Sequence, residues 1–173
     1  AALKAVNNAC RQARAALAEE LDTASLGSLN RFGMYSPGVT DVPQCDFSAL
    51  IGPEMFREFQ VPALTEEINA LDGAIYHLDG PDAIRHLDAV CSVENLDMIQ
   101  WQPGAGNLDK DWSDVYTRID AHGKGLYFQP FTGRGDSEER IVKTWKEYRS
   151  RKLFFTLAPE LGEEIEDLTG RAW

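Results

Sequence analysis

Short apolar segments alternate with amphipathic segments along the second half of the chain, and this alternation constrains the fold more than any other feature. The apolar segments begin at residues 74, 98, 125 and 153, so they recur after 24, 27 and 28 residues. Each is followed by apolar residues three or four apart, which is typical of a helix. The expected strands are 74–78, 98–101, 125–129 and 153–157, and the expected helices are 81–91, 112–119, 137–148 and 160–168. Strands that alternate with helices form a parallel sheet, so the predicted fold class is α/β.

The first half of the chain is less regular. Residues 3–21 carry apolar side chains three or four apart between charged ones, which predicts an amphipathic helix. Residues 29–35 predict a strand, and the prolines and glycine within 37–43 predict a loop. A long helix is expected over 53–71, because proline is accepted in the first helical turn, with a kink or break at Pro62.

Size and charge exclude several classes of protein. The chain has 173 residues, and 28 Asp and Glu against 17 Lys and Arg give a formal net charge of −11. A general binder of nucleic acid or of an anionic membrane surface needs clustered Lys and Arg, so neither is expected as a partner. No apolar run approaches the ~20 residues that cross a bilayer. No linker divides the chain, so we expect a single domain over residues 1–173.

Two of the three cysteines and two of the three histidines are expected to lie outside any reaction centre. Cys10, Cys45 and Cys91 are odd in number and far apart, which favours a reducing cytoplasm over a disulfide framework. Cys10 and Cys91 are expected to pack on apolar helix faces, and Cys45 is either a buried, inert thiol or a neighbour of the site. His86 and His122 lie on expected helices and are assigned to the solvent side.

Polar and aromatic residues stand where the expected strands end: His77 with Asp79, Gln100 with Trp101 and Gln102, and Gln129 with Phe131. In α/β folds, ligands bind beyond the carboxyl ends of the strands, so these residues mark the expected site. An open doubly wound sheet usually carries a glycine-rich phosphate loop, and none is present. The even rhythm favours a (β/α)8 barrel instead. Such a barrel takes ~250 residues, so we expect either a partial barrel or a barrel completed by a second chain.

Two ordered blocks resemble the uroporphyrinogen decarboxylase-like superfamily. The segment CDFSALIGPEMF at 45–56, followed by Phe59 and Pro62, is similar to the block in which an acidic strand end precedes a helix. YHLDG at 76–80 resembles the superfamily's strand end that carries a histidine, and DMIQW at 97–101 resembles its next strand. The similarity covers roughly residues 29–168 and is moderately specific, because both blocks occur in the right order.

The resemblance implies a (β/α)8 barrel of roughly twice this length, of which this chain matches the C-terminal part. The N-terminal strands are then absent or supplied by a homodimer partner. The chain begins without Met, which also suits a processed or partial chain. Superfamily members include the decarboxylase, corrinoid-dependent methyltransferases and cobalamin-independent methionine synthases. The implied function is methyl transfer that involves a corrinoid or a small methylated compound. The implied partners are a small-molecule substrate and a corrinoid protein.

The resemblance also implies a possible zinc site. Zinc methyltransferases of this superfamily use His-x-Cys at the strand end and a second Cys near a late strand, because Zn²⁺ holds and deprotonates a thiol. Here the match is His77-Leu78-Asp79, and Thr156-Leu157-Ala158 holds no Cys. His77 and Asp79 alternate along an extended segment and can face one side. They form a candidate metal pair, or else they bind each other or an organic substrate.

Two alternatives stay open. The first is a uroporphyrinogen decarboxylase-type carboxy-lyase, which needs no cofactor, binds a polyanionic tetrapyrrole with basic groups and uses a buried Asp. The charge of −11 counts against that substrate, although Arg31, Arg57 or Arg85 could compensate locally. The second alternative is a non-catalytic barrel fragment or binding module whose active site needs the absent strands.

The remaining candidates each have a structural alternative. With His77 and Asp79, Asp46 is assigned a catalytic role as acid, base or substrate anchor, or else it caps a helix. Gln100, Trp101, Gln129 and Tyr35 are assigned to substrate binding. Trp101 would form a flat wall against a ring or corrin face, and otherwise belongs to the core. Tyr35 would reach the mouth, and otherwise packs.

Overall fold

The chain forms a parallel sheet with helices packed on one face. The computed structural model describes residues 2–22, 26–108, 110–128, 146–148 and 153–155. The strands, in chain order, are β1 (Ser28–Leu29), β2 (Tyr35–Ser36), β3 (Thr40–Asp41), β4 (Gly73–Asp79), β5 (Met98–Gln102), β6 (Gly125–Phe128) and β7 (Leu153–Phe155). The α-helices are α1 (Ala2–Glu20), α3 (Pro53–Met55), α4 (Val61–Ile68), α5 (Leu87–Cys91) and α6 (Ser113–Ala121). Two 3₁₀ segments, η1 (Asp46–Leu50) and η3 (Pro81–His86), and a π-helical segment, η2 (Phe56–Gln60), complete the description.

The predicted α/β class is confirmed. Strands β3 to β7 form one sheet in the order in which they occur along the chain, and every neighbouring pair is parallel. The four strands expected from the sequence rhythm correspond to β4, β5, β6 and β7. The helices expected over 137–148 and 160–168 lie outside the described residues, apart from 146–148.

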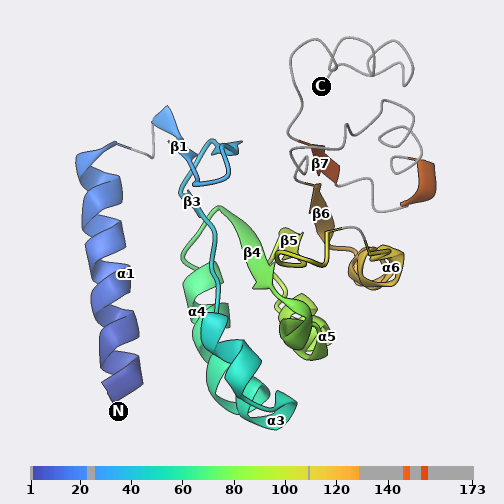
Figure 1. The fold of residues 1–173 in the computed structure, drawn as a ribbon. Helices are drawn as coiled ribbons and strands as arrows, with labels where there is room; N and C mark the ends of the chain where they lie inside the picture. The colour runs from blue at the N-terminus through green and yellow to red at the C-terminus, as the bar shows by residue number, and fades with distance from the viewer. Residues whose placement is uncertain (1, 23–25, 109, 129–145, 149–152, 156–173) are drawn as a thin grey trace, which may run out of the picture.

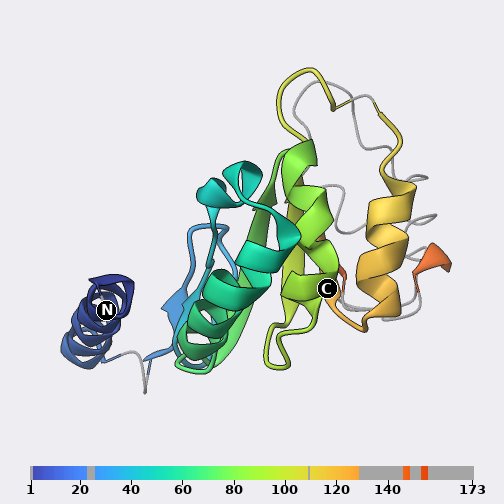
Figure 2. The ribbon, with the colours of Figure 1, turned by 90° about the horizontal axis from the view of Figure 1, so that it is seen from below.

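The described helices that connect β3 to β6 share one face of the sheet. Figure 1 and Figure 2 show α4, α5 and α6 side by side along that face. Side chains alternate across a strand, so every second residue meets the helices. Tyr76, Ile99 and Leu126 are each at most 1% exposed and pack there against Leu64, Val90 and other helical residues. This side holds the larger hydrophobic core.

The long helix expected over 53–71 is a continuous helical run from α3 through η2 to α4. Proline lacks a backbone N–H and disrupts the normal α-helical bonding around it. Pro62 is in the first turn of α4, directly after the π-helical turn η2, so the wider turn accommodates the proline without ending the helix. The predicted kink therefore takes the form of a π segment.

The strand predicted over residues 29–35 is wrong. β1 and β2 are two short antiparallel strands, and residues 30–34 form the turn between them. The side-chain Oδ1 of Asn30 accepts hydrogen bonds from the backbone N–H groups of Phe32 (2.9 Å) and Met34 (3.2 Å). Gly33 has a φ of +75°, which other residues adopt only with strain. The local asparagine and glycine chemistry folds this apolar stretch back on itself.

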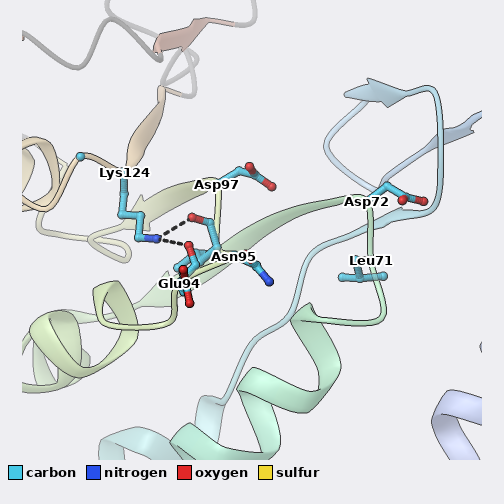
Figure 3. Close-up of a pocket in the computed structure, with 8 residues that line it drawn as sticks. Leu71, Asp72, Glu94, Asn95, Asp97 and Lys124 are labelled. Atoms are coloured by element: carbon cyan, nitrogen blue, oxygen red, sulfur yellow. Dashed lines mark hydrogen bonds between the residues drawn. The ribbon is translucent and has the colours of Figure 1, made fainter.

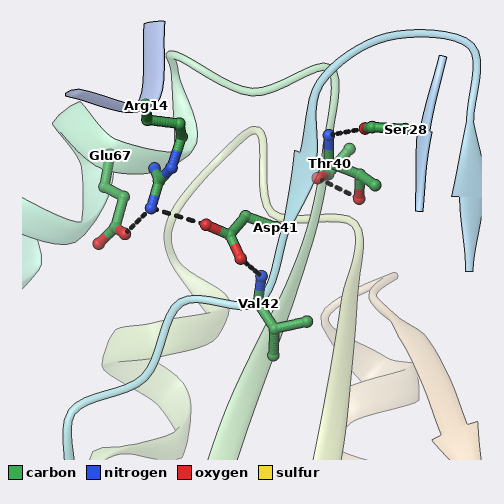
Figure 4. Close-up of polar contacts among 7 residues, drawn as sticks. Arg14, Ser28, Thr40, Asp41, Val42 and Glu67 are labelled. Carbon is green, nitrogen blue, oxygen red and sulfur yellow. Dashed lines mark hydrogen bonds and ion pairs between the residues drawn. The ribbon is translucent and has the colours of Figure 1, made fainter. Parts of the chain in front are cut away.

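Helix α1 lies beside α4 and is joined to it by ion pairs. Arg14 Nη2 contacts Asp41 Oδ2 at 2.7 Å and Glu67 Oε1 at 3.1 Å, so it links α1 to both β3 and α4 (Figure 4). The helix itself matches the prediction for residues 3–21. Its apolar side chains are not buried by the described residues, since Leu17 is 56% exposed, and Cys10 is exposed, contrary to the expectation that it packs.

Lys124 stabilises the amino-terminal end of the sheet. Its ammonium group is buried and donates hydrogen bonds to the backbone oxygens of Glu94 (2.9 Å) and Leu96 (2.8 Å), which Figure 3 shows, and to that of Val93 (2.8 Å). These carbonyls belong to the turn between α5 and β5, and Lys124 directly precedes β6. One charged group therefore holds the turn before β5 against the start of β6.

We expect Lys124→Met to lower the free energy of unfolding by about 3 kcal/mol, because two buried carbonyl oxygens and one partly buried one lose their donor. Chemical denaturation followed by circular dichroism measures this change. Lys110→Met removes an exposed lysine and should alter the value by less than about 0.5 kcal/mol. Equal effects of the two substitutions on the free energy of unfolding would contradict the stabilising role of Lys124.

Candidate functional site

The face of the sheet opposite the helices changes from apolar to polar along the strands. Near the amino-terminal ends, Ile75 and Met98 are paired in register and buried. Two residues further on, His77 is paired with Gln100, and Gln100 is paired with Tyr127. Asp79 and Gln102 are paired at the carboxyl ends. The polar groups therefore collect at the edge where α/β proteins bind ligands.

His77 and Gln100 form the centre of this polar edge. The imidazole Nδ1 of His77 is hydrogen-bonded to Oε1 of Gln100 on the neighbouring strand. Gln100 is 1% exposed, whereas His77 is only partly buried. The sequence predicted both residues at the site, and the structure brings them into direct contact.

The turn between β1 and β2 covers this face. The ring of Phe32 lies edge-on to His77, with the ring centroids 6.0 Å apart, and 5.0 Å from the ring of Tyr127. The hydroxyl of Tyr127 donates to the backbone oxygen of Phe32 at 3.2 Å. Met34 packs on the same cluster. The hairpin is therefore attached to the sheet next to His77.

Asp46 is held at the same edge by Gln44. The amide Nε2 of Gln44 donates to both carboxylate oxygens of Asp46, at 3.1 and 3.0 Å, and its Oε1 accepts a hydrogen bond from Arg31. Gln44 also forms an isolated parallel bridge with His77, whose backbone N–H donates to the oxygen of Pro43 at 2.9 Å. Asp46 is thus two residues from a direct neighbour of His77, and it is exposed.

Asp79 extends the edge beyond His77. It is exposed, and its register partner is Gln102. His77 and Asp79 share one face, as expected from their alternation. Among the described residues, however, no three His, Cys, Asp or Glu side chains gather as a metal site.

Trp101 does not lie with these residues. It occupies the helix face of β5, is 2% exposed and packs edge-on against Trp112 at 5.1 Å between centroids. The structure therefore supports the alternative in which Trp101 belongs to the core. Strand alternation places its side chain on the face of the sheet opposite to that of Gln100 and Gln102. It forms no wall for a ring or a corrin.

Tyr35 also points elsewhere. It is 64% exposed, and its hydroxyl donates to the backbone oxygen of Leu26 at 3.3 Å. The ring lies against Gly27, where a Cβ atom would be only 2.6 Å from the Tyr35 ring. Tyr35 packs on the start of the hairpin rather than at the mouth. Gln129 lies outside the described residues.

Three side chains at this edge were missed by sequence reasoning: Phe32, Gln44 and Tyr127. Gln102 was expected among the strand-end residues. Tyr127 lies on the same sheet face as Gln100, and alternation along the predicted strands could have found it. Phe32 and Gln44 could not have been found in this way, since they come from a turn and a loop that only the tertiary fold brings to His77.

Cys45 is half-buried beside the site. Burial raises the pKa of its thiol above the usual value, and the nearby carboxylate of Asp46 raises it further. Cys91 is buried as expected, and burial raises its pKa to about 12. Neither group is activated as a thiolate, which accords with the inert reading of both.

A cavity of about 440 Å³ lies at the opposite, amino-terminal edge of the strands. It is lined by Leu71, Asp72, Glu94, Asn95, Leu96, Asp97, Gly123 and Lys124 (Figure 3). Asp97 there accepts a hydrogen bond from the backbone N–H of Ala74 at 2.9 Å, and Lys124 binds the carbonyls described above. These polar groups serve the strand starts. In barrels, this end contributes stability rather than chemistry.

His86 is buried, and its assignment to the solvent side is wrong. It is 1% exposed and stacks on Phe56 with ring centroids 4.3 Å apart. Its Nε2 donates to the backbone oxygen of Ser48 at 2.9 Å. His86 thereby joins η3 to η1 and η2. His122 is exposed, as expected, and contacts Asp88 Oδ1 at 3.2 Å.

No family model matches the chain, and neither the curated proteins nor the solved structures include a significantly similar one. Among the described residues, no helix combines the length and the apolar character needed to span a bilayer.

Burial of His86 makes the fold sensitive to acid. Burial lowers the pKa of His86, an effect that the Ser48 hydrogen bond opposes only in part. The unfolded chain therefore binds a proton more readily, and stability is full above the unfolded value of about 6.5 and falls as the pH drops below it. We expect His86→Gln to reduce this loss of unfolding free energy between pH 7.5 and 5.5, as measured by urea denaturation.

The matched substitution His122→Gln replaces an exposed imidazole. The unfolding free energy of this variant should still fall as the pH drops below about 6.5. An unchanged pH dependence in His86→Gln would contradict the assignment.

Proposed function

We propose that this chain is part of a (β/α)8 barrel of the uroporphyrinogen decarboxylase-like superfamily. Two features support the proposal. The described strands follow chain order without reversal, and the described connecting helices α4, α5 and α6 lie on one face. A doubly wound sheet reverses its strand order and carries helices on both faces. The edges at β3 and β7 would then pair with strands from a longer chain or from a second copy.

The activity that the site supports best is methyl transfer to a small molecule. The observation that carries this proposal is the His77–Gln100 pair at the carboxyl edge of the sheet. In the described part of the chain, Nε2 of His77 has no hydrogen-bond partner, so it can exchange a proton with a bound molecule. Asp79 and Gln102 stand beyond it to bind polar groups.

The chemistry needs one proton acceptor. An acceptor molecule with an S–H, N–H or O–H group loses its proton to His77 Nε2 as its lone pair attacks the methyl carbon. The bond between that carbon and the donor breaks, and its electron pair stays with the donor. Atoms and charge therefore balance with the protein supplying only a base.

A cytoplasmic location accords with the free thiols of Cys10, Cys45 and Cys91.

A corrinoid, when bound, would supply the methyl group. The flat wall expected from Trp101 is not available for it, since that side chain is in the core. Phe32 is the aromatic side chain that the described residues place beside His77. The corrinoid is best regarded as a substrate brought by a partner protein.

Zinc does not fit the described donor set. A catalytic zinc site takes three protein ligands, and this edge offers His77 and Asp79 without a thiolate. A zinc site here would need a further ligand from outside the described residues. No step above therefore passes through a metal.

Decarboxylation of a tetrapyrrole fits less well. That reaction uses a buried Asp and several basic groups, whereas Asp46 and Asp79 are exposed. Among the described residues, Arg31 is the basic side chain connected to this edge through Gln44. The carboxy-lyase is kept as the second candidate because Arg31 and Asp46 do stand together there.

To test methyl transfer, the full chain is incubated with methylcobalamin and a panel of small thiols, amines and phenols. We expect loss of methylcobalamin absorbance and a methylated product detected by mass spectrometry. His77→Ala should slow the reaction ~100-fold or more, because it removes the general base. His122→Ala, on an exposed helix end, should not change the rate.

Two other outcomes would contradict methyl transfer. Carbon dioxide release from uroporphyrinogen without methyl transfer would replace the proposal by the carboxy-lyase. Inactivity in both assays, also with the full reading frame, would favour a binding module.

A further inference from the structure

The amide of Gln100 can be oriented by accounting for donors and acceptors. One end of the amide faces the backbone oxygen of Trp101 at 3.3 Å and the Oε1 of Gln102 at 3.5 Å. A backbone carbonyl can only accept, so the NH₂ group of Gln100 must occupy that end. Its carbonyl oxygen Oε1 is then the atom that faces His77.

This orientation decides which nitrogen of His77 carries the proton. The oxygen of an amide accepts and cannot donate, so Nδ1 of His77 must be the donor in their hydrogen bond. In a neutral imidazole the other nitrogen then holds a lone pair. That nitrogen is Nε2, which has no partner within the described part of the chain.

We propose that Gln100 is a positioning residue that holds His77 in the Nδ1–H tautomer, so that Nε2 is the basic nitrogen presented to substrate. The Nδ1–H tautomer is a property of the free protein. The role of Nε2 as a base in catalysis rests on the methyl transfer proposed above. Gln100 itself does not touch the reacting atoms.

Two surrounding features maintain the pair. Gln100 is 1% exposed, so water does not compete for its amide, and the β4–β5 register fixes His77 opposite it. Phe32 lies against the His77 ring from the hairpin side, and the two rings meet edge-on at an interplanar angle of 62°. Gln100 and Phe32 therefore fix the position of the His77 ring.

The test is the nitrogen NMR spectrum of the full chain labelled with ¹⁵N-histidine, at a pH where the imidazoles are neutral. His77 is identified by the signals lost in His77→Gln. We expect its Nδ1 to have the chemical shift of a protonated nitrogen and its Nε2 that of an unprotonated one. A wild-type spectrum with the proton on Nε2 would overturn the proposal, whether or not any variant folds.

Two variants separate a specific role from a general structural one. Gln100→Met keeps the length of the side chain and removes the acceptor, so the Nδ1–H tautomer should lose its dominance. Gln102→Met removes the longer of the two bonds to the Gln100 NH₂ group and leaves the Trp101 carbonyl, which still orients the amide, so the tautomer should be unchanged. An unaltered tautomer in Gln100→Met, with circular dichroism showing a folded protein, would also overturn the proposal.

The catalytic consequence is measured separately. We expect Gln100→Met to lower kcat for methyl transfer ~10- to 100-fold with KM little changed, as is usual when a group that orients a histidine is removed. Gln100→Glu keeps an acceptor for Nδ1 but loses the N–H donor to the Trp101 carbonyl, so it should restore only part of the rate. If the tautomer is as proposed but no methyl transfer occurs, the proposed function fails and the role of Gln100 stands.

Discussion

The pairing of β4 with β5 is the interaction on which the rest of the structure depends. It runs over five residue pairs, from Ile75 with Met98 to Asp79 with Gln102. Because side chains alternate across a strand, this register assigns each residue to the helix face or to the opposite face. A slip by one residue would bring Trp101 into the place of Gln100 and remove the acceptor that His77 uses.

The two ends of the sheet have different tasks. At the amino-terminal end, Lys124 and Asp97 satisfy backbone groups and hold the strand starts together. At the carboxyl end, His77 is bonded to Gln100 and Asp46 to Gln44, which also accepts a hydrogen bond from Arg31, while Asp79 is exposed. Buried polar groups stabilise only when they are paired, so the pairing of Lys124 and Asp97 makes the amino-terminal end structural, and we propose that ligands bind at the carboxyl end.

Much of the fold followed from the sequence, and the errors have identifiable causes. The strands and helices between residues 73 and 128 were predicted because their apolar periods are regular. The hairpin at 28–36 was missed because Asn30 and Gly33 turn an apolar stretch, and β3 was missed because it is two residues long. At the site, the strand-end residues His77 and Gln100 were predicted, whereas Phe32 and Gln44 depend on contacts distant in sequence.

The sequence by itself determined the α/β class, the positions of the main strands and the polar character of their ends, because these follow from local periodicity and composition. The face on which each side chain lies was decided only by the tertiary structure. The segments AIYHL at 74–78 and MIQW at 98–101 are mostly apolar on both faces, so their pattern alone does not separate core from site. Helix packing on one side buried Trp101 and His86, and left His77 and Gln100 together on the other.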